Sequence, residues 1–371
     1  MVNLIKYETP KYRIFQEKGT LKGIEKSYKV LKDEEIVLVQ EIKKEKELRG
    51  SIFNAFEKIN AGDTIHQGDK VAIKINLGGG IHHIPTTYSD PTICEEIIKK
   101  VKDLGATPFV CEADMRAHTM NKKMLRVRGY YKMLQKNNTP FVNLSKYSMV
   151  DMNCHGVDIP LKLPEILLKP DTKIISFAPP KHHWECGITA NQKNMYGAIA
   201  DQKKSRFHRK YERIDKVIAA AARMMSPDIN ILAGFDIGEG MGPHFCIPIK
   251  FNRMIISKDM VRGDKVAAEI LGYPFQLIEY AMINTNRKDV NYSLHESSKW
   301  LDDSILAKIK ENSIDYDSIN FWKPALWLQY FVPHMFQIKA YPPFEFILTW
   351  LNKAFLKKQN VILKKKGGIE T

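Results

Sequence analysis

Residues 71–80 of this chain read VAIKINLGGG, and the fold class is inferred outward from this segment. Its apolar run predicts a buried strand, which the three glycines at 78–80 end. Asp90-Pro91-Thr92 predicts the start of a helix, because proline is favoured in the first turn. Residues 107–111 predict the next strand. This strand–helix–strand order predicts a parallel sheet with helices on its faces.

The same order recurs along the chain. Further strands are predicted at 35–40, 173–177, 230–235 and 253–257, and helices at 44–60, 211–225, 260–271 and 274–284. The segments 181–197 and 236–243 are polar or glycine-rich and predict irregular loops. The fold class is therefore α/β, with a mostly parallel sheet flanked by helices and an aromatic-rich, basic C-terminal extension.

Three regions are expected. Residues 1–64 form an N-terminal arm and edge elements, 65–285 form the α/β core, and 286–371 form a helical extension. Within this extension, residues 321–355 hold eleven aromatic residues interrupted by four prolines, and a lysine cluster follows. Aromatics beside lysines suit a weak contact with a membrane surface. The alternative is a segment that packs on the main body and ends in a solvated basic tail.

The charge balance favours an anionic partner. The chain has 57 Lys and Arg residues against 42 Asp and Glu residues, a formal net charge of +15. A phosphate, a carboxylate, a nucleic acid and a membrane surface all fit this excess. The 44% hydrophobic content excludes wholesale disorder.

The cysteine pattern indicates a reducing compartment. The five cysteines are far apart and form no CxxC pair, so an iron–sulfur cluster motif is absent. A cytoplasmic location is expected. The N-terminus lacks the apolar core of a signal peptide, and no window is apolar enough to predict a spanning helix.

Polar clusters follow the predicted strands, where a parallel sheet binds its ligands. Lys74 and Asn76 share one strand face, and Gly79 lies in a triple glycine that lets the backbone approach an anion. A flexible turn is the alternative. Glu112 and His118 follow the next strand, and for these residues a metal ligand, a substrate clamp and a surface loop all remain open.

The densest cluster is KHHWECGITANQKNMYG at 181–197. It groups Lys181, His182, His183, Lys193 and Asn194, and polar groups of this kind are costly to bury unpaired. The segment therefore predicts a functional site.

A further cluster is DIGEGMGPH at 236–244. Its glycines, Gly240 among them, predict a malleable loop, and Asp236 offers a carboxylate for a metal or a proton. A turn with side-chain hydrogen bonds is the alternative. Asp259 is predicted to cap the N-terminus of the helix that follows it.

These segments, in this order, resemble the family called domain of unknown function 362. The matching pieces are 71–78, 90–92, the strand ending in Glu112, 181–197, His208, 236–243 and 257–264. The resemblance covers roughly residues 65–275, and Lys193-Asn194 with Gly197 and His208 is its most specific part. Some members of that family carry added ferredoxin-type cysteine clusters, which this chain lacks.

The chain is also distantly similar to the N-terminal part of nickel-pincer lactate racemases. That family has a histidine in a turn after an early strand, then a histidine, a lysine that anchors the pincer cofactor, and a nickel-ligating histidine. The similarity implies that His118 and His183 match the first two, Lys193 the anchor and His208 the metal ligand.

The sequence thus predicts a cytoplasmic enzyme, redox or racemase-like, that acts on a small anionic carboxylate or phosphate at the strand ends. Catalysis is assigned to His183, Lys193, His182 and Glu112; substrate binding to Lys74, Asn76, Lys181, Asn194, Gly79 and Gly240; and metal binding to His208, His118 and Asp236. The cofactor is left open between none, a metal ion and a metal-containing cofactor. The oligomeric state is also open.

The alternative is a non-catalytic protein that binds nucleic acid or an anionic membrane through its basic surface. Residues 203–213, KKSRFHRKYER, are the best candidate for such a surface. Nucleic acid is the less expected partner, because no recognisable nucleic-acid-binding motif accompanies them.

Overall fold

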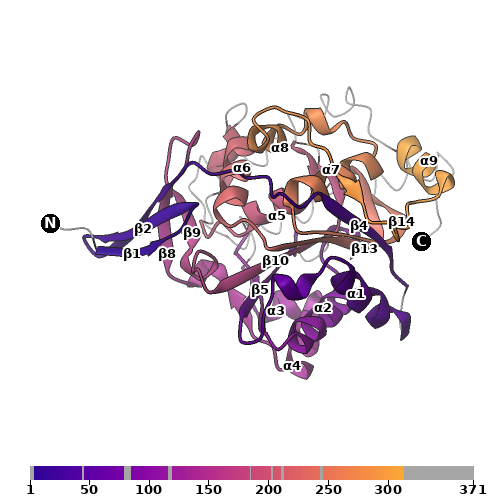
Figure 1. Ribbon diagram of the computed structural model, residues 1–371, viewed down its shortest axis with the longest axis horizontal. Helices are drawn as coiled ribbons and strands as arrows, with labels where there is room; N and C mark the ends of the chain where they lie inside the picture. The colour runs from indigo at the N-terminus through magenta and orange to yellow at the C-terminus, as the bar shows by residue number, and fades with distance from the viewer. Residues whose placement is uncertain are drawn as a thin grey trace.

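The computed structural model describes residues 4–43, 46–78, 85–115, 119–183, 185–201, 204–209, 213–242 and 245–312. The lysine- and aromatic-rich segment beyond residue 312 lies outside these ranges. Two sheets organise the fold, and the larger one carries helices on both faces (Figure 1).

The larger sheet has the strand order β15-β4-β14-β13-β10-β5-β6-β7. Its strands are β15 (Ser293–Leu294), β4 (Ile36–Glu41), β14 (Phe245–Ser257), β13 (Ile229–Met241), β10 (Thr172–Ala178), β5 (Lys70–Ile75), β6 (Thr107–Glu112) and β7 (Phe141–Asn143). A short hairpin of β11 (Lys181–His183) and β12 (Gly187–Thr189) joins it through β13.

The expectation of a mostly parallel sheet is wrong, because the sheets are mixed. The strands β13, β10, β5, β6 and β7 run parallel, whereas β14 is antiparallel to both β13 and β4. The predicted loop at 236–243 is largely the second half of β13, where Ile237 pairs with Ile249 and Glu239 with Ile247. Alternating glycines hide this strand, because they carry no side chain to show a period of two.

The smaller sheet stands at one end of the molecule, on the left in Figure 1. Its order is β1-β2-β3-β8-β9, from β1 (Leu4–Glu8), β2 (Tyr12–Glu17), β3 (Thr20–Glu25), β8 (Met149–Asn153) and β9 (Leu161–Pro164). The N-terminal strands β1, β2 and β3 thus join strands from the middle of the chain through a parallel pairing of β3 with β8.

Helices cover both faces of the larger sheet. One face carries α5 (Asn191–Gly197), α6 (Arg213–Met224), α7 (Met260–Ile270) and α8 (Glu279–Asn284); the other carries α1 (Lys46–Lys58), α2 (Pro91–Asp103), α3 (Lys122–Val127) and α4 (Tyr130–Lys136). The helix α9 is Asp303–Asn312, and the 3-10 helices are Ala61–Asp63, Pro85–Thr87 (η2), Leu144–Lys146, Glu165–Leu167, Lys204–Arg209 (η5) and Phe275–Leu277.

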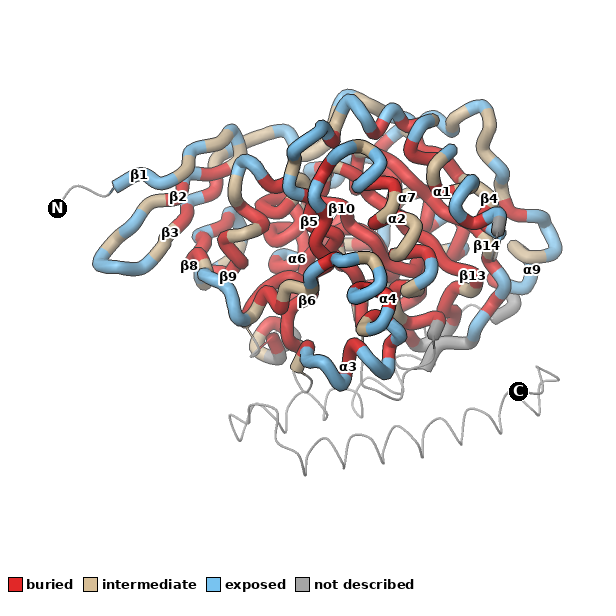
Figure 2. The backbone as a smooth tube through the Cα atoms, turned by 90° about the horizontal axis from the view of Figure 1, so that it is seen from below, coloured by how far each residue is buried: buried red, intermediate tan, exposed pale blue. Residues whose placement is uncertain are grey.

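Strand side chains alternate between two apolar cores. Ile73 and Ile75 of β5 pack with α1 and α2, whereas Ala72 lies on the side of α5 and α6. The backbone is buried through the strands and exposed along the outer loops and helix faces (Figure 2). Because Lys74 has the parity of Ala72, the sheet places its side chain toward α5.

The two predicted helix starts are confirmed. Asp90 accepts hydrogen bonds from the backbone N–H groups of Thr92 (2.7 Å) and Ile93 (3.4 Å), and Pro91 is the first residue of α2. Asp259 accepts from Val261 and Arg262 at 2.8 and 2.9 Å. Both carboxylates satisfy helical N–H groups that have no partner within the helix.

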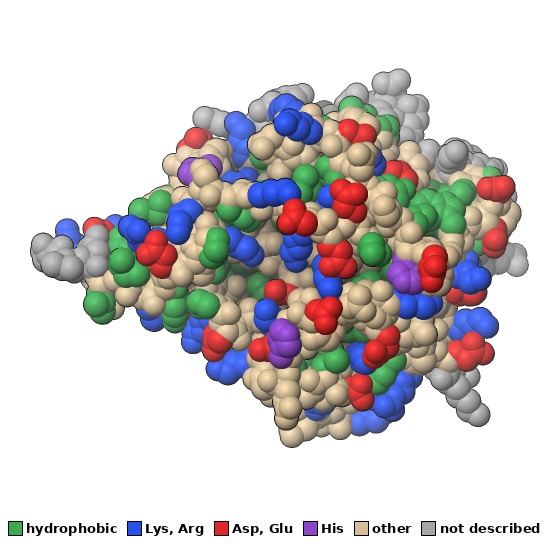
Figure 3. Space-filling model, in the orientation of Figure 1, with side chains coloured by type: hydrophobic (Ala, Val, Ile, Leu, Met, Phe, Trp, Pro, Cys, Tyr) green, Lys and Arg blue, Asp and Glu red, His purple; other side chains and the backbone are tan. Residues whose placement is uncertain are grey.

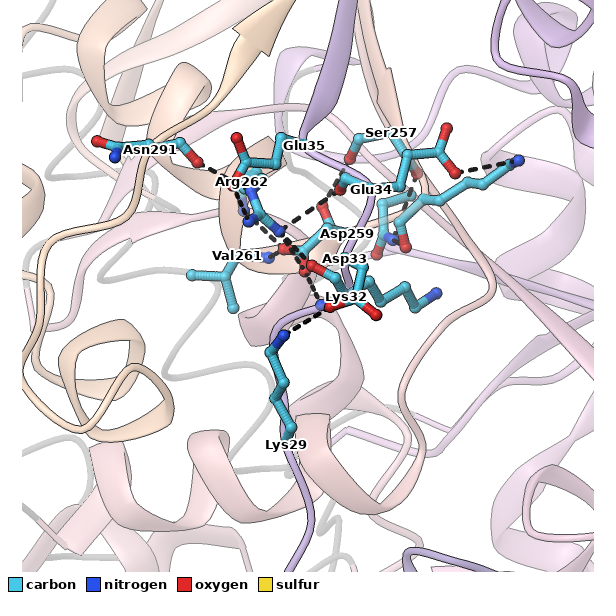
Figure 4. A network of polar contacts seen from close by, with 12 residues as sticks. Lys29, Lys32, Asp33, Glu34, Glu35, Ser257, Asp259, Val261, Arg262 and Asn291 are labelled. Atoms are coloured by element: carbon cyan, nitrogen blue, oxygen red, sulfur yellow. Dashed lines mark hydrogen bonds and ion pairs between the residues drawn. The ribbon is translucent and has the colours of Figure 1, made fainter.

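Asp259 and Arg262 also hold the segment that joins the two sheets (Figure 4). Asp259 accepts from the backbone N–H of Lys32 at 2.7 Å, and Arg262 donates to the Lys32 carbonyl at 2.7 Å and to Glu35 at 2.9 Å. These hydrogen bonds therefore hold the segment between β3 and β4 against the start of α7.

A buried polar chain connects the smaller sheet to α5. Glu25 of β3 accepts from Arg223 at 2.6 and 3.0 Å, and Arg223 donates to Asn284 at 3.0 Å. Asn284 donates to Gln192 at 2.7 Å, and Gln192 donates to Asp264 at 3.1 Å. Each link crosses between different elements, so the chain ties β3, α6, α8, α5 and α7 together.

We predict that Arg223→Met lowers the free energy of unfolding by about 3–5 kcal/mol, because it leaves the Glu25 carboxylate buried without its charged partner. Urea unfolding followed by circular dichroism measures the loss. The double variant Glu25→Leu/Arg223→Met should recover part of it, because no buried charge then remains.

The matched control is the exposed pair of Arg13 and Glu8, whose atoms lie 2.9 Å apart. Arg13→Met should cost less than about 1 kcal/mol. Equal losses for Arg223→Met and Arg13→Met would contradict the role given to the buried pair.

Candidate functional site

Lys74 is the centre of a buried network at the carboxyl end of β5. Its side chain has 0% exposure, and its Nζ lies 2.9 Å from Glu112 Oε1. It donates to the carbonyl of Ile75 at 2.7 Å and to Asn194 Oδ1 at 3.2 Å. An ammonium group has three N–H bonds, so these three acceptors use its donor capacity.

Glu112 joins the ends of β5 and β6. Its Oε1 accepts from Lys74 and from the backbone N–H of Ala113 at 2.9 Å, and its Oε2 accepts from the N–H of Leu77 at 3.2 Å. The carboxylate is buried, and these three contacts connect the two strand ends.

Asn194 attaches α5 to the sheet. Its Oδ1 accepts from Lys74 and from Asn76 Nδ2 (3.3 Å), and its Nδ2 donates to the Lys74 carbonyl at 3.0 Å and to Ser176 Oγ at 3.1 Å. One amide thus contacts β5, β10 and the residue that follows β5. The predicted segment 181–197 is not irregular, because β11, β12 and α5 account for most of it.

Lys181 reaches the same strand end from β11. It donates to Asn76 Oδ1 at 3.0 Å and to the carbonyl of Thr87 in η2, and its side chain is buried. Gly78 lies beside it, and a Cβ there would stand 2.9 Å from the Thr87 carbonyl oxygen and 3.0 Å from Asn76 Oδ1. The close approach of these groups therefore requires glycine at this position.

His182 forms a buried pair with Glu239. Its Nδ1 lies 2.9 Å from Glu239 Oε2, and the Glu239 side chain has 0% exposure. The ring of Tyr273 lies 6.1 Å from the His182 ring, between centroids. An ionised carboxylate only accepts hydrogen bonds, so it fixes the proton on Nδ1 and leaves Nε2 as the basic nitrogen.

In His183 the donor and acceptor nitrogens of the ring are exchanged relative to His182. Its Nδ1 accepts from the backbone N–H groups of Glu185 (3.2 Å) and Cys186 (3.3 Å). In the neutral ring the proton then lies on Nε2, which makes that nitrogen a donor. In the two adjacent histidines, Nε2 is therefore an acceptor in His182 and a donor in His183.

Lys193 and Lys204 lie near one tyrosine ring. Their Nζ atoms are 5.4 Å and 6.0 Å from the centroid of Tyr196. Burial raises the pKa of the Asp215 carboxyl to about 7, the charge of Glu185 adds to this, and the charge of Lys193 opposes it. Among the described residues, no hydrogen bond or ion pair engages the half-buried ammonium of Lys193.

Asp264 of α7 caps α5 from outside. The residue before α5 is Ala190, which has no side-chain acceptor. Asp264 instead accepts from the backbone N–H of Asn191 (2.7 Å) and of Gln192 (3.1 Å). Burial raises the pKa of this carboxyl to about 7, although the hydrogen bonds from Gln192 and Asn191 oppose the shift.

Two further predicted site residues, Asp236 and Gly240, do not join this network. Asp236 forms an ion pair with the exposed Lys250 at 2.9 Å, and Gly240 lies in β13 opposite Cys246. Gly79 and His118 lie outside the described residues, as does the side chain of His208 in η5. Within the described ranges, no three His, Cys, Asp or Glu side chains are arranged to hold a metal ion.

Sequence reasoning missed Lys204, Ser176 and the capping role of Asp264. Lys204 lies in the basic stretch 203–213, which reads as a surface, yet its side chain is buried. Ser176 has the same strand parity as Ile174 on β10, and this alternation was the available signal.

The fold and this strand-end site define an α/β protein of a known family. The family model described as "Domain of unknown function (DUF362)" matches residues 71–269, more than half of the chain. The protein therefore belongs to this family, as the motifs at 71–78 and 181–197 indicate.

Two individual proteins are similar to the chain. The thylakoid-associated protein sll1697 of Synechocystis sp. (strain ATCC 27184 / PCC 6803 / Kazusa) is 24% identical over 216 residues, which are 57% of this chain and 65% of that protein. The match thus spans slightly less than two thirds of this relative. The lactate racemase apoprotein from Thermoanaerobacterium thermosaccharolyticum has a TM-score of 0.41 and 13% identity, covering 73% of this chain and 62% of that one.

No helix in the described part of the chain combines the length and the apolar character needed to cross a membrane.

We predict that the protonation of Asp264 makes stability depend on pH. Its pKa in the fold, about 7, exceeds the ordinary value of 3.8, so the folded state binds this proton more tightly than the unfolded chain. The contribution to stability is fully present below about pH 3.8 and is lost as the pH rises through about 7. Relative to Asp264→Asn, the native protein should lose up to a few kcal/mol between pH 4.5 and 8.

Urea unfolding of both proteins across this pH range measures the difference. The amide lowers stability at every pH because its Nδ2 faces a backbone N–H, but it does not titrate. Parallel stability–pH curves for the two proteins would show that Asp264 keeps an ordinary pKa in the fold.

Proposed function

We propose that this protein is an enzyme that transfers a proton at a carbon atom of a small anionic molecule, with His182 as the base. The reaction is of the racemase or isomerase type and takes place near the carboxyl ends of β5, β6 and β10. The observation that carries the proposal is the buried contact of 2.9 Å between His182 and Glu239.

This pair has the properties that a general base requires. An imidazole titrates near neutral pH, and a carboxylate at Nδ1 orients the ring and stabilises the imidazolium that forms when Nε2 takes a proton. Placing both groups in the interior has a desolvation cost, which purely apolar side chains would avoid. The cost is understandable if the pair performs chemistry.

Lys193 supports an anionic substrate. Its ammonium is half-buried on α5 and lies near the Tyr196 ring. In this structure the ammonium groups of Lys74 and Lys181 contact Asn194, Glu112 and Asn76, so we assign them to positioning the site. Their direct contact with substrate stays a prediction, as do the catalytic roles of His183 and Glu112.

The charge pattern on one face of the molecule gives no support to nucleic-acid binding. On the face shown in Figure 3, Lys and Arg side chains alternate with Asp and Glu side chains and form no continuous stripe. A continuous basic stripe is the feature that nucleic-acid binding needs. A weak membrane contact through the C-terminal extension stays a prediction, because that segment lies outside the described residues.

The cysteines support the proposal of a cytoplasmic location. Cys94, Cys111, Cys154 and Cys186 are free and buried, and burial raises the pKa of the Cys94 and Cys186 thiols well above the usual range. Free thiols are the normal state in a reducing compartment.

Hydrogen–deuterium exchange at carbon tests the proposal without knowledge of the product. The full chain is incubated in D₂O with a panel of 2-hydroxy acids, 2-oxo acids, amino acids and phosphate esters, and proton NMR follows the loss of C–H signals. We predict exchange with one class of compound. His182→Gln should lower the rate by at least about 100-fold, and Glu239→Gln by about 10–100-fold, because the imidazole loses its orienting carboxylate.

The control is Asp151→Asn, which removes a carboxylate from β8 in the smaller sheet and affects only the surface ion pair with Lys162. This variant should exchange at the native rate. Absence of exchange with every class, or native activity in His182→Gln, would refute the proposal.

A further inference from the structure

Lys204 is a buried lysine whose described partners are all uncharged. It begins η5, and its side chain is 7% exposed. Its Nζ donates to the carbonyl of Gly197 at 2.8 Å and to that of Asp114 at 3.4 Å. These contacts place the ammonium beside the end of α5 and the end of β6, next to the network of Lys74 and Glu112.

We propose that Lys204 is a nucleophilic amine that forms an imine with the carbonyl carbon of a small oxo acid. This inference rests on the proposed function, in which the site takes a small anionic molecule, and it names the substrate class.

The hydrogen bonding leaves Lys204 one donor to use. An ammonium group has three N–H bonds, and the described residues supply two carbonyl acceptors, of which that of Asp114 is at the long limit. No described carboxylate lies within ion-pair distance of its Nζ. A lysine with a purely structural role at a helix end keeps its charge in water. Lys204 instead brings its charge into the interior.

Burial favours a neutral amine at Lys204 more than at a surface lysine. Burial lowers the pKa of Lys204 to about 8; Glu112, Asp114 and Asp201 oppose this shift, and the nearby ammonium of Lys74 adds to it. Roughly a tenth of the molecules then carry the neutral amine at pH 7. A desolvated lysine beside a second cation is a recognised way to activate an amine for attack on a carbonyl group.

Gly197 keeps these groups close together. A Cβ at this position would lie 3.0 Å from Lys74 Nζ and 3.4 Å from Glu112 Oε1. The absence of a side chain lets Lys74, Glu112 and the Gly197 carbonyl, which Lys204 contacts, share one small volume. The half-buried ammonium of Lys193, near the same Tyr196 ring as Lys204, supplies positive charge for the carboxylate of an oxo acid.

The covalent step balances without a redox partner. The ammonium first gives a proton to a solvent base. The lone pair of Nζ then forms a bond to the carbonyl carbon, the π electrons of the carbonyl move to oxygen, and the oxygen takes the proton that the nitrogen gives up. The resulting carbinolamine loses water and gives the imine. A protonated imine acidifies the C–H beside it, which is the bond that the proposed proton transfer breaks.

Reductive trapping tests this inference. The full chain receives a short pulse of pyruvate as the probe, followed by borohydride, which adds hydride to an imine and fixes it as a secondary amine. Peptide mass spectrometry locates the adduct. We expect Lys204 to be labelled at least tenfold more than the exposed Lys162, and its labelling rate to rise with pH through about 8.

The variants separate reactivity from structure. Lys204→Arg keeps a positive charge and a donor for the Gly197 carbonyl but forms no imine, so it should fold and lose the adduct. Lys162→Arg is the matched surface control and should label like the native protein. Circular dichroism and the melting temperature of each variant establish that it is folded.

Labelling of Lys204 no greater than that of Lys162, or absence of any adduct, overturns the inference. So does an unchanged total adduct in Lys204→Arg. The proposed function is tested by a separate measurement, the exchange of C–H in D₂O. Exchange without trapping refutes the imine alone, and trapping without exchange refutes the proton transfer alone.

Discussion

The site depends on the contacts that the buried ammonium of Lys74 makes. A lysine without exposure is costly unless it is both paired and hydrogen-bonded. Here Glu112 supplies the charge, and Asn194 and the Ile75 carbonyl supply the other two acceptors. Because Glu112 ends β6 and Asn194 belongs to α5, one ammonium fixes two strand ends and the helix that crosses them.

The position of α5 follows from polar contacts at both of its ends. Asp264 accepts from its first N–H groups, and Lys204 donates to the carbonyl of Gly197 at its end. Between them, Asn194 bonds to β5 and β10. A helix of seven residues is too short to be stable by itself, so these contacts take the place of intrinsic helix propensity. The chain of buried hydrogen bonds through Gln192 and Arg223 extends this order as far as β3.

Hydrophobic periodicity was sufficient to predict the parallel centre of the sheet. Residues 71–77, 107–111 and 173–177 are apolar runs, and the helix α2 between the first two has a clear N-cap, so β5, β6 and β10 follow from local chemistry. The strands at 230–235 and 253–257 were predicted, but their extension into the antiparallel hairpin of β13 and β14 was missed, because the glycines of β13 carry no periodic signal. The helix predicted at 274–284 starts only at Glu279, with a short 3-10 turn before it.

The sequence predicts which residues form the candidate site, but it does not predict which of them contact one another. Lys74, Asn76, Glu112, Lys181 and Asn194 were each identified from the sequence, and the structure brings them into one network. The sequence carries no information on which lysine is satisfied by neighbours and which is not, because that depends on contacts such as the one between Lys74 and Asn194, 120 positions apart. For the same reason, the charge of Lys204 reads as part of a surface stretch although the side chain is buried.

A double-mutant cycle on Lys74 and Glu112 measures how strongly this buried pair organises the site. Unfolding free energies are measured in urea for Lys74→Met, Glu112→Leu and the double variant. If the buried pair organises the site, each single variant loses about 3–5 kcal/mol, and the double variant loses at least about 2 kcal/mol less than their sum. Losses that add to within about 0.5 kcal/mol would show that the two groups act independently, which would contradict the role given to this pair.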